Sequence, residues 1–346
     1  MNIYHMVSGQ GLGGPKQVYM DLHRMFAGLG YQIKPVVKAR SAVASFHRDR
    51  SESYIGLKGY IRRRFWLPSI TVLRSQLPRK GLMIVHKPID AWFVRRSCPD
   101  MTIVLIVHGY HHRGIESADY LIAVSDSVAD YLRVRTQLPV VVIPNMLYEL
   151  PDDQEMKIST PLQFGFLGFF RRKKGLTELC RAMRQLRGDY EVKIAGWGWI
   201  GYWLRFLKWF WQLDKLTIQP WVTDKQAWFD AIDVFVLPSR SETFGLVVLE
   251  ALSRSKCVLA TRSGGPSEII QSGQNGWLVP TRSPDQLAQA MQSIIDDPKH
   301  MMAVRKDARL HVQRCYSRDV ICQKWVDFLK GITTAQAQPE PCSTVQ

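Results

Sequence analysis

Short apolar runs alternate with helix-compatible stretches along most of the chain, and this alternation constrains the fold more than any other feature. In the first half the runs lie at 1–7, 32–37, 82–85, 103–107, 120–124 and 140–143. In the second half they lie at 162–167, 191–195, 216–218, 233–237, 257–260 and 277–279. Apolar strands separated by helices are typical of parallel sheets that are covered on both faces. The pattern therefore predicts an α/β protein built from Rossmann-like, doubly wound sheets.

The length of 346 residues exceeds what one compact core holds comfortably, so we expect two domains. Residues 149–161 are polar and contain proline, which is typical of an interdomain linker. The predicted N-terminal domain is then 1–148 and the predicted second domain is 162–317. The last periodic stretch, 318–329, predicts a helix, and the small polar residues of 333–346 predict a disordered tail.

The composition is strongly basic, with 46 lysines and arginines against 30 acidic residues and a formal charge of +16. Such a field attracts phosphates, nucleic acids or anionic membranes, and the charge alone does not choose among them. Residues 34–80 hold twelve of the cations, interleaved with Tyr60, Phe65 and Trp66. This mixture favours either a solvated basic surface or contact of residues 58–70 with an anionic membrane. No zinc-finger spacing or RNA-binding aromatic motif supports nucleic acid as a partner.

The sequence predicts a cytoplasmic protein with no membrane-spanning segment. Residues 1–7 lack the basic start of a secretory signal, and no apolar run approaches the roughly 20 residues that cross a bilayer. The six cysteines show no C-x-x-C and no paired metal spacing, which indicates reduced thiols.

A glycine-rich turn follows the first predicted strand. Gly9, Gly11 and Gly14 match G-x-G-x-x-G between a strand and a helix, a pattern typical of dinucleotide sites. The acidic residue expected about 20 positions later is missing, and Lys38 follows the next strand instead. This argues against NAD and leaves NADP weakly supported. What remains is a helix start whose backbone N–H groups face an anionic or polar group.

Several polar groups follow predicted strands and should gather at one edge of each sheet. In the first domain these are His108, Ser125 and Asn145. In the second domain a basic turn, 171–174, joins a strand to a helix and favours a grip on a diphosphate, although an ordinary basic surface loop is an alternative.

The strand ending at Leu237 is followed by a polar loop with Glu242 and by a helix with Glu250. Both carboxylates are therefore expected to border one cleft at the carboxyl edge of the second sheet.

The predicted helix at 201–215 is unusually aromatic. We expect one side of it to face the sheet, through Tyr202, Phe206, Trp209, Phe210 and Leu213. That assignment leaves Trp203, Trp211, Arg205 and Lys208 without a place in the core. Core packing explains most of this composition, and contact with a membrane interface or a partner is the alternative.

The segment from Glu242 to Glu250 resembles the E-x7-E signature of retaining, nucleotide-sugar-dependent glycosyltransferases of family 4 (glycosyl transferases group 1), which have the GT-B fold. The resemblance extends over about residues 1–330. Further motifs match in the family's order: the glycine-rich first turn, Val107-His108, 118–125, 143–145, Lys174-Gly175, 263–265 and Asn275-Gly276.

The resemblance implies two Rossmann-like domains facing a cleft, with the acceptor bound mainly by the first and the donor mainly by the second. It also implies that the final helix, 318–329, packs back on the first domain. Glu242 and His108 are the implied catalytic residues, lying at the donor sugar.

The resemblance also assigns the groups around the nucleotide. Glu250 would bind the ribose and Lys174 the diphosphate, and the remaining implied donor contacts are Arg172, Lys173, Phe244, Gly245 and Leu246. The implied phosphate or acceptor loop comprises Gly13, Gly14 and Lys16, and Ser125 and Asn145 complete the cleft.

Three positions depart from the family pattern and leave the donor open. Phe169 stands where the family often has arginine. The acidic residue that the family commonly has after Ile-Pro-Asn-Gly is absent, because Met146 and Leu147 follow Asn145. Gln219-Pro220 stands where glycine is usual.

The expected activity is transfer of a sugar from a UDP-, GDP- or ADP-sugar to a lipid-linked, lipopolysaccharide or polysaccharide acceptor at the cytoplasmic membrane surface. The membrane contacts are expected at 58–70 and at 201–215. The sequence has no D-x-D motif, so we expect no metal and no other cofactor; retention of configuration is implied by the family alone. The alternatives are a GT-B sugar-nucleotide epimerase or phosphorylase, a basic nucleic-acid-binding protein and, more distantly, an NADP oxidoreductase.

Overall fold

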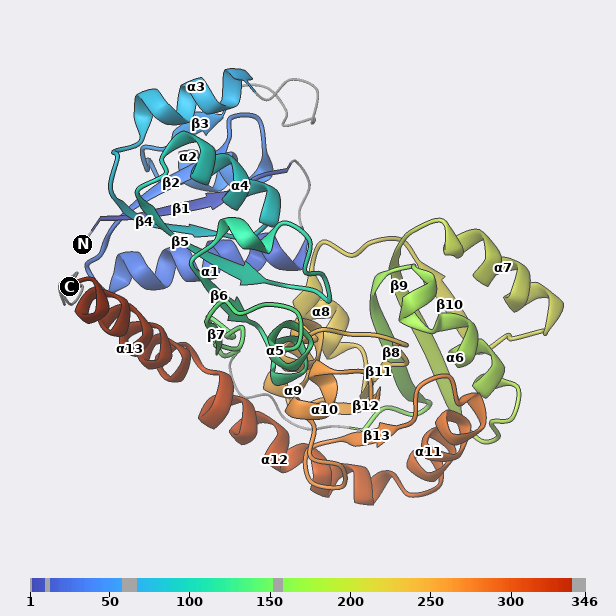
Figure 1. The fold of residues 1–346 in the computed structure, drawn as a ribbon. Coiled ribbons are helices and arrows are strands. Elements are labelled where there is room, and N and C mark those ends of the chain that lie inside the picture. Colours follow the sequence, from blue (N-terminus) through green and yellow to red (C-terminus); the bar gives the residue numbers. More distant parts are fainter. Residues whose placement is uncertain (1, 10–12, 58–66, 152–157, 338–346) are drawn as a thin grey trace.

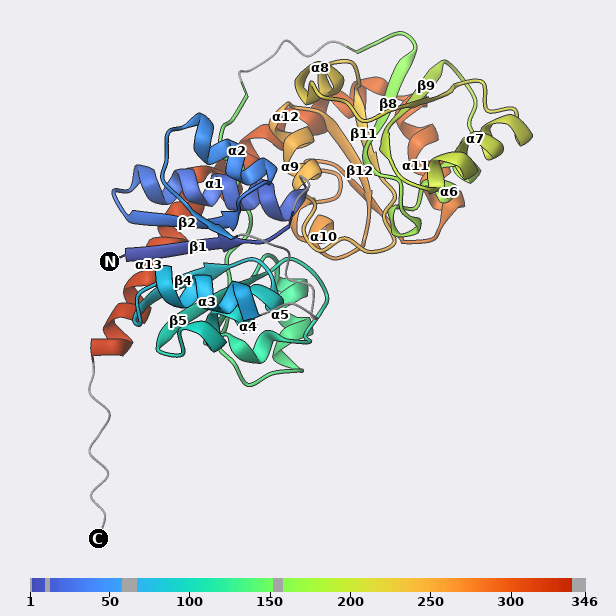
Figure 2. The ribbon, with the colours of Figure 1, turned by 90° about the horizontal axis from the view of Figure 1, so that it is seen from above.

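The computed structural model describes residues 2–9, 13–57, 67–151 and 158–337. These residues form two α/β domains that contact each other (Figure 1, Figure 2). Each domain is built on one parallel sheet, as the alternating pattern predicts, and the doubly wound α/β architecture is confirmed.

The first domain has a seven-stranded sheet in the order β3-β2-β1-β4-β5-β6-β7. Its strands are β1 (Asn2–Val7), β2 (Gln32–Lys38), β3 (Ile55–Leu57), β4 (Gly81–Val85), β5 (Met101–Val107), β6 (Tyr120–Ala123) and β7 (Val140–Val142). Its helices are α1 (Gly14–Gly28), α2 (Ala42–Asp49), α3 (Leu67–Gln76), α4 (Pro88–Ser97), the short η1 (Ile115–Ser117) and α5 (Asp126–Arg133).

The second domain has a six-stranded sheet in the order β10-β9-β8-β11-β12-β13. Its strands are β8 (Leu162–Phe169), β9 (Tyr190–Trp197), β10 (Leu216–Gln219), β11 (Val234–Leu237), β12 (Cys257–Thr261) and β13 (Trp277–Val279). Its helices are η2 (Arg172–Lys174), α6 (Leu176–Met183), α7 (Ile200–Phe210), α8 (Lys225–Asp230), α9 (Leu246–Ser253), α10 (Gly265–Ile269) and α11 (Pro284–Asp296).

The central strands explain why both sheets are parallel and covered on both faces. In β5 every residue except Thr102 is buried, and β11 and β12 are buried throughout. Strands without a polar side need apolar partners above and below, which the helices supply. The segments that follow β5, β6 and β11 meet at the interface between the domains, where hydrogen bonds join His108, Ser125 and Thr243.

Two long helices connect the second domain back to the first. The helix α12 (Pro298–Tyr316) lies on the second domain, and α13 (Arg318–Ala337) lies along the first domain beside α1 (Figure 1, Figure 2). Trp325 of α13 is buried with its ring 5.4 Å from Phe26 of α1, and Phe328 lies 5.9 Å from Tyr120 of β6. The described end of the chain is therefore part of the first domain.

The structure corrects the prediction of disorder from residue 333 onward. The helix α13 continues to Ala337, because Ile332 is still buried and the hydroxyls of Thr333 and Thr334 donate to carbonyls one turn earlier. The remaining tail lies outside the described residues. So do residues 58–66, which hold most of the predicted membrane-contact segment 58–70; residues 67–70 begin helix α3.

The structure also reverses the expected orientation of the aromatic helix. Ile200, Leu204 and Leu207 form the buried side of α7, whereas Tyr202, Phe206, Trp209 and Phe210 are exposed. Only Leu213 of the residues assigned to the core is buried. Among the described residues, no helix combines the length and apolarity needed to cross a bilayer.

Candidate active site

The loop between β11 and α9 presents Glu242 at the carboxyl edge of the second sheet. The backbone of Glu242 donates to Ser263 O at 2.8 Å and accepts from Gly265 N at 3.1 Å. Its carboxylate forms an ion pair with Lys174 Nζ, and the two side chains are only 13% and 15% exposed. Reduced solvent screening strengthens such a pair. The carboxylate of this loop and the lysine of the turn after β8 therefore lie together at the sheet edge.

A single glycine allows the basic turn to approach this loop. Gly175 has φ 67°, and a Cβ placed on it would lie 1.8 Å from the carbonyl oxygen of Pro238. Any other residue would push the turn away, because that distance is far inside van der Waals contact. Of the four consecutive cations only Lys174 is partly buried, whereas Arg172 and Lys173 are exposed. The guanidinium of Arg171 lies over the ring of Phe169, 5.3 Å from its centroid.

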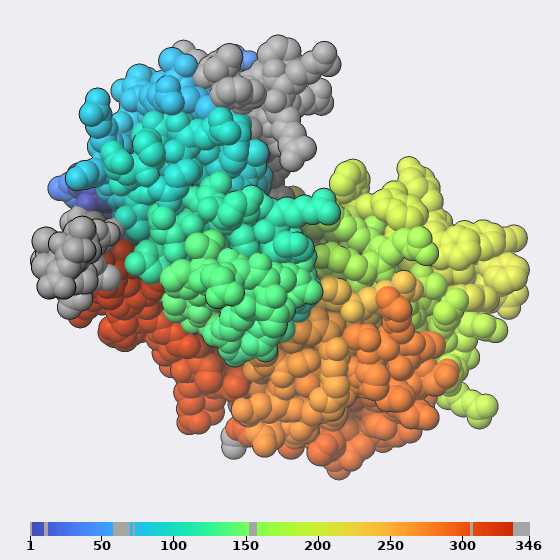
Figure 3. All heavy atoms as spheres, in the orientation of Figure 1, coloured from blue at the N-terminus to red at the C-terminus, as the bar shows by residue number. Residues whose placement is uncertain are grey.

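Two hydrogen bonds fasten the Glu242 loop to the first domain. Thr243 Oγ1 donates to the carbonyl oxygen of His108 at 2.8 Å, and Ser125 Oγ donates to the carbonyl oxygen of Thr243 at 2.7 Å. Thr243 is the residue after Glu242, so the contact brings the ion pair next to the strand end that carries His108. Above this contact the two domains diverge and leave an open notch (Figure 3).

A second contact joins α10 to the start of α5. The carboxylate of Glu268 accepts the backbone N–H groups of Asp126 and Ser127, each at 2.8 Å. These groups lack partners inside their own helix, and a negative charge is favourable at a helix start. Nearby, Gly264 has φ 99°, and a Cβ there would lie 2.2 Å from Tyr110 Oη. The start of α10 in the second domain therefore packs closely against the start of α5 and Tyr110 in the first domain.

His108 is the end of a chain of three hydrogen-bonded histidines. His5 Nε2 lies 2.8 Å from His86 Nε2, and His86 Nδ1 lies 2.9 Å from His108 Nε2. The rings of His86 and His108 are stacked, with centroids 5.1 Å apart. His5 and His86 are buried, whereas His108 is partly exposed. The chain thus leads from the interior of the first domain to the candidate site.

All three histidines are neutral at physiological pH. Burial lowers the pKa of His108 to about 3, with a further contribution from His111. Burial, followed by the neighbouring imidazoles, also holds the pKa values of His5 and His86 well below the usual value for histidine. Since a neutral imidazole carries a single N–H, the chain must donate in one direction.

The surroundings of His5 decide that direction. Its Nδ1 is buried and has no hydrogen-bond partner among the described residues. Because an unpaired buried N–H is rarer than an unpaired acceptor, the proton of His5 belongs on Nε2. His5 then donates to His86, and His86 Nδ1 donates to His108 Nε2. His108 is left with its proton on Nδ1, as a hydrogen-bond donor for a ligand.

Two lysines converge at the predicted phosphate or acceptor loop: Lys16 from the loop itself, and Lys87 from the segment after β4. Lys16 is 7% exposed, and its pKa is lowered to about 8 by burial and by the neighbouring Lys87 and Lys38. Lys87 Nζ donates to the carbonyl oxygen of Ser8 at 2.6 Å. Positive charge is thus concentrated at the start of α1, where an anion would be favourable.

The glycines of this loop lie close to the second domain. A Cβ on Gly14 would lie 3.8 Å from Leu246 Cδ1, whereas Gly13 has open space around it. The loop therefore approaches the start of α9, the helix that carries Glu250. Of the other predicted donor contacts on this turn, Phe244 is buried with its ring 6.0 Å from that of Tyr316, and Gly245 adopts φ 95° as the N-cap of α9.

Glu250 faces a pocket beside the interdomain connection. Its carboxylate accepts from Lys225 Nζ of α8 at 2.7 Å. The pocket has a volume of about 350 Å³ and is lined in part by Leu147, Glu149, Lys225 and Glu250. In this arrangement Glu250 and Glu242 belong to different ion pairs.

The other two predicted cleft residues, Ser125 and Asn145, are both buried. Ser125 is the N-cap of α5, accepting from Val128 N at 3.3 Å in addition to its bond to Thr243. Asn145 is buried and lines a small cavity with Asp21 of α1 and Trp325 of α13.

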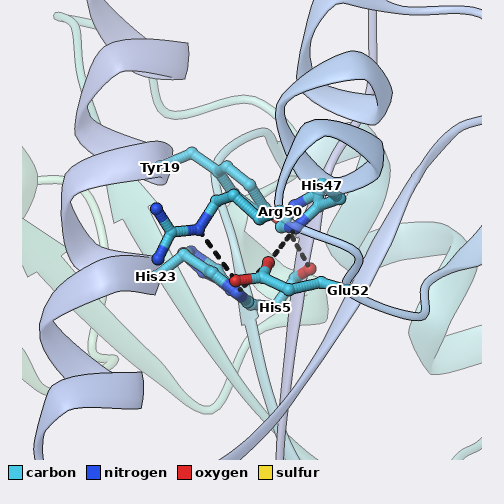
Figure 4. Close-up of polar contacts among 6 residues, drawn as sticks. All are labelled: His5, Tyr19, His23, His47, Arg50 and Glu52. Atoms are coloured by element: carbon cyan, nitrogen blue, oxygen red, sulfur yellow. Dashed lines mark hydrogen bonds and ion pairs between the residues drawn. The ribbon is translucent and has the colours of Figure 1, made fainter.

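Among the described residues, a separate cluster of two histidines and a glutamate has the geometry of a possible metal site. Candidate ligand atoms of His23, His47 and Glu52 lie within 4.8 Å of one another (Figure 4). Glu52 Oε2 lies 3.1 Å from His23 Nε2 and 2.7 Å from His47 Nδ1, and Arg50 Nε donates to Glu52 Oε1 at 2.9 Å. Tyr19 Oη contacts the other nitrogen of His47 at 3.0 Å. Each of these ligand atoms already has a partner, and Arg50 supplies the positive charge beside the carboxylate.

Several residues of the site were missed in the sequence. His86 and Lys87 follow the buried strand β4 directly, as His108 follows β5, so the same strand-end pattern predicts them. His5 lies within a strand and Glu268 within a short helix, and neither position carries a comparable signal. Thr243 lies next to Glu242 inside the quoted motif.

Comparison with known proteins identifies glycosyltransferases as relatives of this chain. Residues 151–311 match the family model described as Glycosyl transferases group 1. The D-inositol 3-phosphate glycosyltransferase of Pseudarthrobacter chlorophenolicus is 36% identical over 158 residues, covering 43% of this chain and 38% of that protein. The putative colanic acid biosynthesis glycosyltransferase WcaL of Escherichia coli is 27% identical over 190 residues, covering 50% of this chain and 46% of that protein. The chain thus matches less than half the length of these curated relatives.

Similarity of structure, in contrast to similarity of sequence, extends over nearly the whole chain. The crystal structure of HepE from Anabaena in complex with UDP and glucose superposes with a TM-score of 0.81, at 16% identity, over 95% of this chain and 99% of that chain. At this identity the similarity concerns the fold alone.

Proposed function

The chain belongs to the glycosyl transferases group 1 through residues 151–311 and has the GT-B fold, and on this premise we propose that it transfers a sugar from a nucleotide-sugar donor to a hydroxyl group of a glycan acceptor. The observation that carries the proposal is the ion pair of Lys174 and Glu242, held beside His108 by the interdomain hydrogen bonds of Thr243. The loop that carries the carboxylate, with its paired cation, thus contacts the strand end that carries a neutral hydrogen-bond donor.

The chemistry requires a stabilised leaving diphosphate and a positioned sugar. During transfer the bond between the anomeric carbon and the diphosphate oxygen breaks, and a bond from that carbon to the acceptor oxygen forms. Lys174 offsets the charge that develops on the diphosphate, and the backbone N–H groups at the start of α9 add to this. Glu242 orients the donor sugar, and the His108 Nδ1–H donates to it.

We assign retention of configuration to a front-face reaction. The acceptor proton then passes to the leaving diphosphate oxygen, so no side chain has to serve as the general base. Glu242 stabilises the oxocarbenium-like transition state electrostatically without forming a covalent intermediate. Fixed cations replace the bridging metal in this scheme, so the reaction is metal-independent.

Glu250 is proposed to bind the donor ribose. In the structure its carboxylate is paired with Lys225, so the ribose hydroxyls would share or replace that interaction. Arg172 and Lys173 are exposed and are proposed to assist Lys174 at the diphosphate. A UDP-sugar is the first donor to test, because UDP occupies the similar fold of HepE; GDP- and ADP-sugars remain in the comparison.

The acceptor is proposed to be a lipid-linked, lipopolysaccharide or polysaccharide glycan, used at the cytoplasmic face of the membrane. Support comes from the relative named for colanic acid biosynthesis and from the net charge of +16, which favours an anionic surface. Lys16, with Lys87 beside it, offers the acceptor or the donor phosphate a cationic contact.

A donor screen tests the proposal directly. The purified chain is incubated with UDP-, GDP- and ADP-sugars, and thermal shift and sugar release are measured for each. One donor should raise the melting temperature and be hydrolysed slowly, and Glu242→Gln should retain the thermal shift while losing hydrolysis. Absence of any response to every donor would overturn the assignment. Conversion of the donor to an epimer without acceptor would identify an epimerase instead.

A further inference from the structure

Within the described part of the chain, exposed aromatic side chains are concentrated on the outer surface of α7. Seven of the twelve large hydrophobic side chains that are exposed among the described residues lie between Trp197 and Phe210. Tyr202 is 81% exposed and Trp209 is 74% exposed. Single exposed apolar residues are common, but a contiguous aromatic patch marks an interaction site.

These side chains form one surface. At about 100° per residue, the exposed aromatic positions of α7 fall within an arc of about 120°, and the centre of this arc lies about 130° around the helix from that of the buried Ile200, Leu204 and Leu207. Their rings contact each other: Phe206 stacks on Trp203 at 5.2 Å and on Phe210 at 5.6 Å. We call this surface the aromatic face; its helical members are Tyr202, Trp203, Phe206, Trp209 and Phe210, and Trp197 and Trp199 precede it.

The charge around the aromatic face has one sign. From Val192 to Leu213 the chain contains Lys193, Arg205 and Lys208 and no acidic residue. Arg205 is exposed and lies about 100° around the helix from the centre of this arc, whereas Lys208 is only partly exposed and lies farther round. Two copies of this face brought together would place like charges against each other, which is unfavourable. Anionic lipid headgroups, in contrast, complement the cations, and tryptophan and tyrosine favour the boundary between headgroups and acyl chains.

The geometry fits a helix that lies on a membrane. With 11 residues, α7 is about 16 Å long, too short to cross the hydrocarbon layer. It is also the outermost helix of the second domain, on the side away from α13 (Figure 1, Figure 2). Nothing in the described structure covers its outer side in either view. We infer that the aromatic face of α7 docks the second domain onto an anionic lipid bilayer, with the exposed Arg205 contacting the headgroups.

This docking would orient the candidate active site. The helix follows Gly198 and Trp199 directly after β9, and so begins at the same carboxyl edge of the sheet that presents Lys174 and Glu242. A bilayer in contact with α7 therefore lies near the edge where the donor is proposed to bind. The inference extends the proposed function by naming a lipid surface as a partner, and it holds or fails without any sugar transfer.

Co-sedimentation with vesicles tests the inference. The full chain is mixed with vesicles of phosphatidylcholine or of phosphatidylcholine with phosphatidylglycerol. We expect binding to the mixed vesicles, with a blue shift of tryptophan emission. Trp209→Glu should lower the partition coefficient about tenfold or more, because it removes an aromatic side chain that the bilayer would bury. Val134→Glu is the matched control: it places the same charge at a position of the first domain that is 78% exposed, and should not change binding.

The contribution of charge is measured separately. Arg205→Gln should weaken binding to the mixed vesicles about fivefold, from roughly 1 kcal/mol for one cation, and should leave binding to phosphatidylcholine nearly unchanged. Equal effects of Trp209→Glu and Val134→Glu would overturn the inference. So would a wild-type dimer that Trp209→Glu converts to a monomer and that does not bind vesicles. Donor hydrolysis in solution should be the same in all these variants, so loss of docking is distinguishable from loss of the active site.

Discussion

The two walls of the candidate active site hold their polar groups in place by opposite means. On the first-domain wall, His5, His86 and His108 are neutral and hydrogen-bonded to one another, because burial disfavours their charged forms. On the second-domain wall, Lys174 and Glu242 remain in an ion pair at the sheet edge. One wall therefore offers an oriented N–H, and the other offers full charges. The difference teaches that the charge stabilisation of the reaction should reside in the second domain, and that the histidines of the first domain should add no titration near neutral pH.

The largest effect should come from breaking the charged wall. Glu242→Gln or Lys174→Met is expected to lower turnover about a hundredfold to a thousandfold, because each removes an electrostatic contact to the reacting groups. Steady-state kinetics with the donor identified by screening measure this loss. Glu116→Gln, at an exposed position of the first domain, is the matched control and should leave turnover unchanged. Turnover within threefold of the wild type in both active-site variants would remove these residues from the mechanism.

The next effect should come from breaking the histidine chain at its middle. His86→Leu is expected to lower turnover about tenfold and to destabilise the fold by about 1–3 kcal/mol, since it leaves buried ring nitrogens unpaired. His86→Asn retains an amide N–H near the former Nδ1 and should recover part of the activity. Nitrogen-15 NMR of labelled histidine reads the tautomer of His108 directly. A proton found on His108 Nε2 in the wild type would contradict the direction of donation argued here.

A smaller effect is expected at the glycine-rich loop. The pKa of Lys16 is lowered to about 8, so its positive charge is lost as the pH rises through that value. Binding of an anionic substrate group should weaken between about pH 7 and pH 9, raising KM about fivefold with little change in kcat. Lys16→Arg should abolish this pH dependence, because arginine stays charged. A KM that is flat over this range in the wild type would show that Lys16 does not contact the substrate.

The stability effect of Lys16 has a defined sign. Its pKa is lower in the folded protein than in the unfolded chain, where it is near 10.5. Between these values the unfolded chain binds more protons, so this group makes stability rise with pH.

The smallest effect is an expected absence of change on the neutral wall. With a pKa of about 3, His108 does not titrate between about pH 5.5 and pH 7.5, so it should add no inflection to the profile of kcat/KM. An inflection near 6.5 that disappears in His108→Asn would break the comparison. The same depressed pKa predicts that the contribution of His108 to stability is complete above about pH 6.5 and declines as the pH falls toward 3. Denaturation of the wild type and of His108→Asn at two pH values measures it.

The sequence predicted the sheets well and the surface of α7 poorly, and both results have physical reasons. A strand such as β5 is recognisable because a run of seven residues with a single polar member has no solvated side. The helix α7 is apolar around almost its whole circumference, so periodicity did not show which side is buried. The aliphatic Leu204 and Leu207 occupy the core, whereas the larger aromatic rings remain outside.

In the candidate site, too, some features were predictable from the sequence and others were not. Glu242 and Lys174 follow strand ends and were predicted individually, whereas their pairing depends on the approach of Gly175 to Pro238 across 60 or more positions of sequence. His86 shares the strand-end position of His108 and was overlooked. His5 was not predictable, because its role depends on a partner brought beside it by the pairing of β1 with β4.

The path of the chain makes the first domain discontinuous in sequence. The chain leaves it near Leu147 and returns at Ser317, and these residues pair side by side, with Leu147 N donating to the carbonyl oxygen of Tyr316 at 2.9 Å. The second domain is thus a single insert with adjacent entry and exit points. Residues 1–148 expressed alone would lack Trp325, whereas exchange of the segment between the two crossings would replace the whole second domain and keep the first domain complete. Recombination among related chains, natural or engineered, therefore has a ready-made pair of junctions at these two positions.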